Sequence, residues 1–208
     1  MIAEYGCVVV ANGLFPSGEQ ALQALRRAGY VVACDGAVTA LEQVRMPDAV
    51  VGDLDSLPEE IRGRYAGRLH RVEDQETNDL TKAMGYAKAA GFRDVLILGA
   101  TGLREDHSLG NISLLMQYAE EFDRVEMLSD YGRFTPLLQT GVLESRPGQQ
   151  VSLFSLCPSG TVSVKGLRYP IENRRLTAWW EATLNEATGN EFEVILQDGA
   201  KVLVYRVL

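Results

Sequence analysis

Two aspartates one residue apart, Asp53 and Asp55, are the first side chains whose spacing suggests chemistry. They lie in residues 50–57, where a short apolar run gives way to a loop. In an extended segment alternate side chains point the same way, so both carboxylates would converge while Leu54 faces the core. Converging carboxylates repel each other unless a cation neutralises them, and Mg²⁺ shared with substrate phosphates fits that role. The alternative, which so short a motif favours by itself, is an acidic turn in which Asp55 or Ser56 caps the next helix.

Two further carboxylates follow other predicted strands. Asp35 comes directly after the apolar segment 30–34, and Asp79 closes the acidic loop 74–79. Because ligands bind beyond the carboxyl ends of the strands in an open parallel sheet, we expect the four aspartates to gather at one edge. Mg²⁺ keeps coordination positions for phosphate oxygens, so this set predicts a magnesium site for a nucleotide polyphosphate. The alternative is that Asp35 and Asp79 each cap a turn or a helix of their own.

A glycine-bearing loop that leads into a helix, residues 99–111, supplies candidate phosphate contacts. Gly99 and Gly102 permit close backbone approach to a phosphate, and the amides of a helix start favour anions. The loop has neither a Walker A pattern nor G-x-G-x-x-G. Arg104 is its only fixed cation and is either a charge-assisted phosphate donor or a solvated surface arginine.

Three more side chains near these loops have two interpretations each. Asp106 and His107 form a candidate acid–base pair, although a histidine next to a helix start also serves as a capping or packing residue. Lys82, on the helix after the acidic loop, would meet a phosphate or pair with a neighbouring carboxylate. Spacing alone therefore predicts a Mg²⁺-dependent enzyme acting on a nucleotide polyphosphate, without naming the acceptor.

The elements that must position these loops alternate between strand and helix. Apolar runs predict strands within residues 7–13, 30–34, 50–52, 68–73, 94–102 and 124–130. Helical spacing predicts helices at 19–29, 37–44, 58–67, 80–91 and 108–121, the last with Leu109, Ile112, Leu115 and Met116 on one face. The fold class that follows is α/β, with an N-terminal open, mostly parallel sheet and flanking helices.

The pattern changes after Gly132. Short alternating runs of Val, Phe, Leu and Tyr, separated by turn residues, predict a small all-β, sandwich-like C-terminal domain. We expect the boundary between Tyr131 and Gln149, where Pro136 and Gly141 should interrupt regular structure. The domains are therefore placed at residues 1–132 and 133–208.

Composition excludes several classes of protein. The 208 residues carry a formal net charge of −8 with no long basic run, which argues against nucleic acid or an anionic membrane surface as the main partner. No leader sequence opens the chain, and the apolar runs are too short to span a bilayer. The three cysteines, Cys7, Cys34 and Cys157, lie in apolar contexts without a C-x-x-C pair, so we expect buried, reduced thiols and a cytoplasmic protein.

Four motifs, in order along the chain, together resemble those of the thiamine pyrophosphokinase family. They are CDGA at 34–37, GDLDS at 52–56, DQETNDLTKA at 74–83 and GATGLREDHSLGN at 99–111. The β-rich end, with GLRYPIEN and TLNEATGNEFEV, also looks like that family's C-terminal domain. The resemblance implies transfer of a pyrophosphoryl group from ATP to thiamine, giving thiamine diphosphate and AMP. It also implies a homodimer whose active sites use both subunits.

The resemblance also assigns roles to residues. It implies that Asp35, Asp53, Asp55 and Asp79 handle Mg²⁺ and phosphate, and that Asp53, Asp55, Asp79, Lys82 and Asp106 form the catalytic set. The implied ATP contacts are Gln75, Thr77, Gly99, Gly102, Arg104, His107 and Asn111. The implied thiamine contacts are Tyr169, Thr183 and Asn185.

The sequence departs from the family pattern at four positions, Thr39, Asn78, Leu103 and Leu184. Leu103 replaces the second glycine of a Gly-Gly-Arg turn, where a side chain crowds backbone approach to phosphate. Two other functions therefore stay open: a Mg²⁺-dependent hydrolase or transferase for another acceptor, and a non-catalytic module that binds thiamine or a nucleotide. The adjacent Trp179 and Trp180 fit a dimer anchor, a ligand wall or packing.

Overall fold

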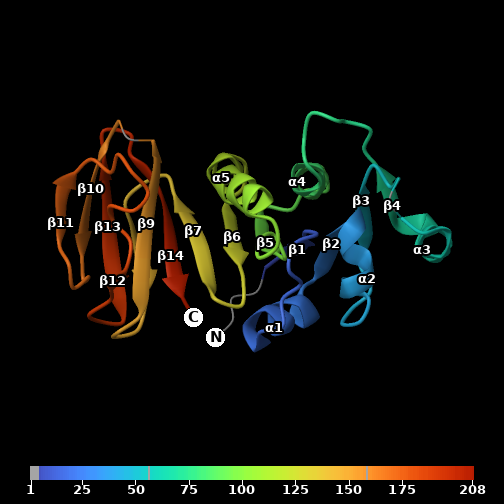
Figure 1. The fold of residues 1–208 in the computed structure, drawn as a ribbon, viewed down its shortest axis with the longest axis horizontal. Helices are drawn as coiled ribbons and strands as arrows, with labels where there is room; N and C mark the ends of the chain where they lie inside the picture. The colour runs from blue at the N-terminus through green and yellow to red at the C-terminus, as the bar shows by residue number, and fades with distance from the viewer. Residues whose placement is uncertain (1–4, 56, 158) are drawn as a thin grey trace. The chain divides into compact units, whose positions relative to one another are not determined.

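The computed structural model describes residues 5–55, 57–157 and 159–208. The chain divides into two compact units, drawn in Figure 1. The first, called the α/β unit, comprises the chain up to Ile112 together with residues 121–130; the second, called the β unit, comprises residues 113–120 and 131–208. Ser56 lies outside the described residues, and so does the side chain of Cys157.

Six parallel strands form the sheet of the α/β unit, in the order β6-β5-β1-β2-β3-β4. Their bounds are β1 Cys7–Val10, β2 Tyr30–Cys34, β3 Ala49–Gly52, β4 Leu69–Arg71, β5 Asp94–Leu98 and β6 Arg124–Leu128. All residues of β1 and β3 are buried, as expected of strands covered on both faces by helices. The parallel α/β prediction is confirmed.

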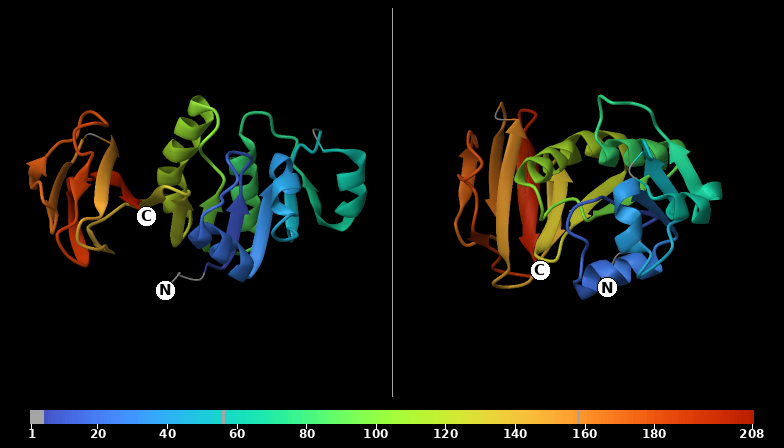
Figure 2. Two further views of the ribbon diagram at one scale, coloured as in Figure 1. Left: turned by 60° about the horizontal axis from the view of Figure 1, so that its bottom comes forward. Right: turned by 45° about the vertical axis from the view of Figure 1, so that its right-hand side comes forward.

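The helices of this unit alternate with its strands. They are α1 Glu19–Arg27, α2 Val38–Leu41, α3 Glu59–Arg64, α4 Asp79–Ala89 and α5 Glu105–Glu121, with short 3₁₀ turns η1 Asp35–Ala37 and η2 Ala66–Arg68. Helices α1 and α4 lie on opposite faces of the sheet (Figures 1 and 2). Among the residues that the structure describes, none of these helices has the length and apolar character needed to cross a membrane.

Helix α5 differs from its prediction at the N-terminal end. It begins at Glu105 instead of Ser108, so Asp106 and His107 belong to its first turn. Leu115 and Met116 are buried as predicted, but Leu109 is exposed, because the residue that completes the buried face is Tyr118. The early start brings two predicted functional residues onto the rigid end of a helix.

The strand order creates a switch point at the carboxyl ends of β1 and β5. The chain runs from β1 to β2 on one side, and β5 pairs with the other side of β1. At such a point the loops after the two neighbouring strands leave the sheet in opposite directions, which opens a crevice for a ligand. The loops after β1 and β5 are therefore the natural site of binding.

The β unit contains two antiparallel sheets, in the orders β12-β9-β14-β7 and β11-β10-β13-β8. The strands are β7 Gly132–Leu137, β8 Gly141–Glu144, β9 Gln150–Cys157, β10 Thr161–Lys165, β11 Ile171–Arg174, β12 Asn185–Glu186, β13 Glu191–Gln197 and β14 Lys201–Val207. Alternate residues such as Leu153 and Val204 from one sheet and Val162 and Phe192 from the other share one core. The sandwich-like prediction is confirmed.

Two predicted interruptions in this region are wrong. Pro136 lies inside β7, and Gly141 is the first residue of β8. A proline is tolerated in a strand at a position where its missing N–H is not needed for the ladder. The sequence pattern does not show which strand positions must donate a backbone N–H to the ladder. It therefore predicts a break at the proline.

Candidate functional site

A pocket of about 480 Å³ opens at the switch point of the α/β unit. Three strand-end segments line it: the loop after β1 with Asn12, the start of α4 with Asp79, and the loop from β5 into α5 with Arg104. Of the predicted ATP contacts, four line this pocket, namely Thr77, Arg104, His107 and Asn111. The volume and the polar lining suit a small polar ligand.

Asp35 is the most buried of the predicted metal ligands. It is only 5% exposed and accepts backbone N–H groups from Gly36 at 2.7 Å and from Leu54 at 3.1 Å. Burial raises the pKa of the Asp35 carboxyl, and the charges of Asp79 and Asp53 raise it further against those two hydrogen bonds. The Asp35 carboxyl therefore binds a proton more tightly than an aspartate in water does.

Two glycines make room for this acidic corner. A Cβ atom at Gly52 would lie 2.6 Å from the Asp35 carboxylate carbon, and one at Gly36 would lie 2.1 Å from the amide nitrogen of Asn12. Residues 34 and 51 are partners in the β2–β3 register, so these loops leave adjacent strands side by side. The space beside each of these two glycines is thus filled by a side chain from a neighbouring loop, Asp35 at Gly52 and Asn12 at Gly36.

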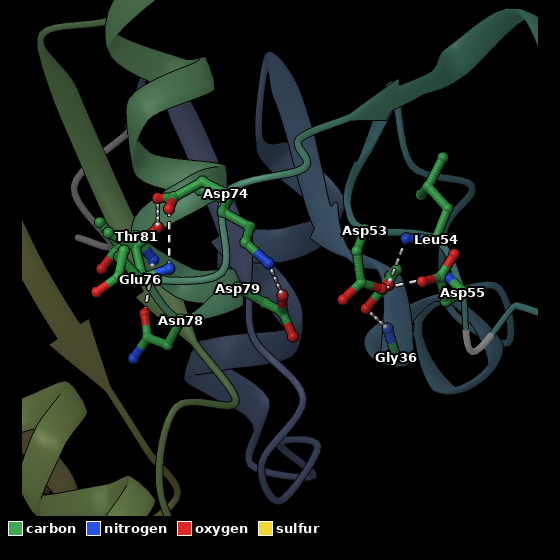
Figure 3. A network of polar contacts seen from close by, with 12 residues as sticks. Gly36, Asp53, Leu54, Asp55, Asp74, Glu76, Asn78, Asp79 and Thr81 are labelled. Atoms are coloured by element: carbon green, nitrogen blue, oxygen red, sulfur yellow. Dashed lines mark hydrogen bonds and ion pairs between the residues drawn. The ribbon is translucent and has the colours of Figure 1, made fainter.

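Lys82 lies among the carboxylates. Its side chain is 4% exposed, and its ammonium pairs with Asp79 at 3.1 Å (Figure 3). Burial lowers the pKa of Lys82, but the hydrogen bond and charge of Asp79, with the charges of Asp53 and Asp35, raise it above the ordinary value. Asp35, Asp53 and Asp79 therefore share one electrostatic environment with the Lys82 ammonium. Of its two predicted roles, Lys82 has the ion pair with a neighbouring carboxylate.

The Asp53–Asp55 segment is not extended. Leu54 is buried as predicted, but its φ of 65° is left-handed, which turns the chain between the two carboxylates. Asp53 accepts the backbone N–H of Asp55 at 3.1 Å (Figure 3). The Asp55 carboxylate lies 3.7 Å from Arg71. The expectation of two side chains converging from an extended strand is therefore wrong in its geometry.

The helix-capping alternative for this segment also fails for Asp55. Helix α3 has Pro58 at its N-cap, and no side chain of the described residues caps it. The loop is instead tied down by Arg62, whose guanidinium donates to the carbonyl of Leu57 at 3.0 Å and to that of Leu54. Ser56, the other capping candidate, lies outside the described residues.

The carboxylates do not form a ready-made metal cage. Within residues 5–55, 57–157 and 159–208, no group of three or more His, Cys, Asp or Glu side chains is arranged to hold a metal ion. Mg²⁺ commonly binds one or two protein carboxylates and completes its coordination with water and substrate phosphates. The donor chemistry of Asp35, Asp53 and Asp79 fits that kind of shared site.

Arg104 and Asp106 form a bidentate ion pair at the start of α5. The guanidinium Nε and Nη2 lie 3.1 Å and 2.6 Å from the two carboxylate oxygens. The hydrogen bonds from Arg104 and from the backbone N–H of His107 lower the pKa of Asp106 to about 2. Asp106 is therefore a weak base at neutral pH and orients Arg104, while the exposed His107 lines the pocket.

The acidic loop before α4 is organised by its own side chains. Asp74 accepts hydrogen bonds from the Thr77 hydroxyl and from the backbone N–H of Glu76, which lower its pKa. Thr77 lines the pocket, whereas Gln75 is exposed and is not among the lining residues found in the described chain. The loop thus presents one of its two predicted ATP contacts to the pocket.

Gly99 and Gly102 are required by packing. Both have positive φ, and a Cβ atom would lie 2.7 Å from the Ala11 carbonyl oxygen at Gly99 and 2.7 Å from the Leu14 Cβ at Gly102. Backbone bonds such as Gly13 N–H to the Gly99 carbonyl at 2.6 Å join the same loops. Leu103, the departure from the family pattern, lines the pocket with its side chain exposed.

The predicted thiamine contacts belong to the β unit. Tyr169 is 57% exposed, and Asn185 is buried behind it. The Asn185 carboxamide accepts the backbone N–H of Tyr169 at 3.0 Å and donates to its carbonyl at 2.7 Å. Asn185 therefore holds the Tyr169 backbone, and its own amide is directed at protein.

Thr183 lies in a second exposed segment of that unit. Its hydroxyl donates to the carbonyl of Trp180 at 2.9 Å, which closes a turn. The next residue, Leu184, is exposed and left-handed, with φ 59°. Both tryptophans are exposed, Trp180 at 74% and Trp179 at 40%, and Trp179 also contacts Phe154 edge-on with ring centroids 6.0 Å apart. The two tryptophans thus have different surroundings.

Asn12 and Asn78 are among the polar residues of the pocket that the sequence analysis missed. Asn12 ends the first apolar run in an Asn-Gly pair, which resembles an ordinary turn. Asn78 was noted only as a departure from the family pattern. Their place in the sequence could have identified them. Each follows a predicted strand or precedes a predicted helix, at the edge of the sheet where ligands bind.

Comparison with known proteins gives consistent matches along the chain. A family model described as thiamin pyrophosphokinase, catalytic domain, matches residues 21–127. A second, described as thiamin pyrophosphokinase, substrate-binding domain, matches residues 132–205. The two matched segments follow one another in the same order as the α/β and β-rich patterns of the sequence.

Individual relatives carry the same description. A thiamine pyrophosphokinase of Oryza sativa subsp. japonica is 30% identical over 155 residues, which are 65% of this chain and 58% of that protein. One of Bacillus subtilis (strain 168) is 27% identical over 150 residues, or 68% of this chain and 70% of that protein. The match thus spans little more than half of the rice protein.

Solved structures share the fold. The thiamin pyrophosphokinase from Geobacillus thermodenitrificans superposes with a TM-score of 0.78 at 22% identity, covering 97% of both chains. That from Candida albicans gives 0.81 at 16% identity, covering 100% of this chain and 90% of the other.

Proposed function

The chain belongs to the thiamin pyrophosphokinase family, and from that premise we propose that it transfers the pyrophosphoryl group of ATP to the hydroxyl of thiamine. The products are thiamine diphosphate and AMP. The observation that carries the proposal is the pocket at the switch point, which is lined by residues from both motifs expected to contact ATP, Thr77 from one and Arg104, His107 and Asn111 from the other.

We propose Mg²⁺ as the cofactor, with Asp35, Asp53, Asp55 and Asp79 as the carboxylates that would hold it. The raised pKa of Asp35 beside Asp79 and Asp53 supports this, because a divalent cation would relieve the repulsion among these groups. When bound, Mg²⁺ supplies charge neutralisation to the phosphate oxygens of ATP. The left-handed turn at Leu54 orients Asp53 and Asp55 relative to the buried Asp35.

The chain's own cations and helix ends are proposed to bind and position the phosphates of ATP. Arg104, held by Asp106, donates to phosphate oxygens from the start of α5, and Lys82 balances the carboxylates at the reaction centre. In-line attack of the thiamine hydroxyl on the β-phosphorus needs positioning and charge neutralisation more than covalent chemistry. Gln75, Gly99, Gly102, His107 and Asn111 complete the proposed ATP contacts.

The β unit is proposed to bind thiamine. Residues 1–132 form the catalytic domain in this proposal, and residues 133–208 form the thiamine-binding and dimerisation domain. Tyr169 and Thr183 are the proposed direct contacts, supported by the exposed ring of Tyr169, and Asn185 is proposed to act by fixing the Tyr169 backbone with its amide. A homodimer would bring this surface to the ATP site of the second copy. We propose a cytoplasmic location, which suits the free thiols of Cys7 and Cys34.

Product analysis tests the function directly. Purified protein is incubated with ATP, Mg²⁺ and thiamine, and the nucleotides and thiamine esters are separated. Equal amounts of AMP and thiamine diphosphate are expected. Release of ADP with thiamine monophosphate would contradict pyrophosphoryl transfer, and thiamine-independent phosphate release would support a nucleotide hydrolase. Tight calorimetric binding of both ligands without any product would support a binding module.

Replacing Tyr169 with alanine is expected to raise the KM for thiamine about two- to thirtyfold. An aromatic face against a cationic ring contributes roughly 0.5 to 2 kcal/mol, depending on desolvation. The KM for ATP and the melting temperature should change little, because the ring is exposed. Tyr169→Phe is the matched control, since it keeps the ring and removes only the hydroxyl. Unchanged thiamine kinetics in Tyr169→Ala would exclude this residue from the site.

A further inference from the structure

Asn78 and Asn111 are joined across the pocket wall of the α/β unit. The Asn78 amide nitrogen donates to the Asn111 carboxamide oxygen at 3.0 Å, although 33 residues separate them in the chain. Asn78 is the N-cap of α4, Asn111 lies on α5, and both line the pocket. We call these two residues the carboxamide pair. The pair links the N-cap of α4 to the second turn of α5, and both helices border the same ligand space.

The orientation of both amides is fixed by backbone groups at the two ends of the pair. The backbone N–H of Thr81 donates to the Asn78 carboxamide oxygen at 2.9 Å, so Asn78 must present its nitrogen to Asn111. Asn111 must then offer its oxygen to Asn78, and its nitrogen donates to the Ala100 carbonyl at 2.8 Å. If either amide were flipped, its nitrogen would face another N–H donor and its oxygen would face another acceptor. The pair is therefore polarised in one direction.

The polarity leaves donors available at the pocket. Each carboxamide nitrogen has two hydrogens, and each uses one of them in the bonds just described. Among the described residues, no other acceptor is bonded to either nitrogen. Both residues line the pocket with Arg104, whose guanidinium is paired with Asp106. A wall with spare N–H donors beside a guanidinium matches an anionic group rich in acceptor oxygens.

We propose that Asn78 is a positioning residue for the polyphosphate chain of the nucleotide: it locks Asn111, and the two spare N–H groups of the carboxamide pair bind phosphate oxygens. This proposal rests on the proposed function in taking the ligand of the pocket to be ATP. It assigns a role to a position where this sequence departs from the family pattern, which has threonine. A threonine keeps an oxygen that can cap α4 but has no nitrogen to hold Asn111.

Asn78→Thr is therefore the decisive variant. Calorimetry with Mg²⁺-ATP in the absence of thiamine is expected to show about tenfold weaker binding, the loss typical of a hydrogen bond to a charged group. The affinity for AMP should stay within about twofold, because AMP lacks the β- and γ-phosphates. The KM for ATP should rise while the KM for thiamine stays unchanged. The melting temperature should also stay unchanged, because threonine can still cap α4. Asn190→Thr, the same change at an exposed residue of the β unit, is the matched control.

A double-mutant cycle separates positioning from independent contacts. If Asn78 acts through Asn111, the loss of ATP affinity in Asn78→Thr combined with Asn111→Ala should be clearly smaller than the sum of the two single losses. Wild-type affinity for Mg²⁺-ATP in Asn78→Thr would overturn the proposal. Equal weakening of ATP and AMP would overturn the assignment to the polyphosphate. A wild-type protein that binds Mg²⁺-ATP but makes no thiamine diphosphate contradicts the proposed function alone, since these binding measurements do not need turnover.

Discussion

Asp35→Asn is expected to lower kcat for thiamine diphosphate formation by roughly a thousandfold or more, a loss typical of removing a group that stabilises developing charge. In the absence of metal, the free energy of unfolding of the same variant should lie within about 1 kcal/mol of that of the wild type. Asparagine is isosteric but neutral, so it removes the charge that Asp79 and Asp53 oppose. Against that gain, one of the hydrogen bonds from Gly36 and Leu54 is lost, because the asparagine nitrogen cannot accept it.

The pH dependence of stability gives this prediction a second readout. The pKa of Asp35 is raised in the folded protein above the ordinary value of 3.8, so the folded state holds this proton more tightly than the unfolded chain. The contribution of Asp35 to the free energy of unfolding therefore falls as pH rises through the interval between the unfolded and folded pKa values. Above that interval, including at neutral pH, it stays at its lowest value. The stability of Asp35→Asn relative to the wild type should increase over that same interval.

Urea unfolding at several pH values, with and without Mg²⁺, measures both effects. Mg²⁺ should stabilise the wild type and have little effect on Asp35→Asn, since a ligand stabilises only the state that binds it. Asp123→Asn is the control, because Asp123 is an exposed aspartate paired with Arg93. Near-normal kcat in Asp35→Asn, or an undiminished response to Mg²⁺, would remove Asp35 from the proposed metal site.

Lys82→Met is expected to lower both stability and activity. Methionine fills much of the same volume, but the carboxylates of Asp79, Asp53 and Asp35 lose their internal cation. Loss of one partner of a fully buried ion pair costs about 3 to 5 kcal/mol, and since Asp79 is 44% exposed we expect about 2 kcal/mol. Without the ammonium at the reaction centre, kcat should fall roughly a hundredfold or more.

Mg²⁺ distinguishes this electrostatic cause from a packing defect. If the loss of stability comes from uncompensated carboxylates, added Mg²⁺ should stabilise Lys82→Met more than it stabilises the wild type. Lys88→Met, on the same helix but exposed and paired with Glu121, provides the control for helix propensity. Equal responses of Lys82→Met and wild type to Mg²⁺ in unfolding experiments would contradict the electrostatic explanation.

The parts of the fold that were predictable have strong local patterns. Strands such as Tyr30–Cys34 are continuous apolar runs, and their alternation with helical segments is enough to predict a parallel sheet. What could not be predicted depends on contacts between distant residues. The N-terminal end of α1, for example, is held by Asp130, which accepts the backbone N–H groups of Ser17 and Gly18 from more than 100 residues away. No local pattern encodes that partner.

The site shows the same division. The positions of the acidic loops followed from the strand ends, because topology brings them to one edge. The conformation of each loop did not follow, since the left-handed Leu54 is a non-glycine residue whose geometry is imposed by its buried side chain and by Arg62. The carboxamide pair was also out of reach, because it joins Asn78 and Asn111 through a hydrogen bond between two helices. Family motifs identify residues by similarity, whereas these contacts arise from tertiary packing.

The fit between Asp35 and the empty side-chain position of Gly52 also constrains how this protein can evolve or be redesigned. Any side chain at position 52 would collide with the Asp35 carboxylate, and any side chain at position 36 would collide with Asn12. We therefore expect a side chain at position 52 to be tolerated only with a smaller residue at 35, and a side chain at position 36 only with a smaller residue at 12. A transplant of residues 52–55 into another open α/β sheet would carry the acidic motif but not its function, unless the loops from the two neighbouring strands were moved with it.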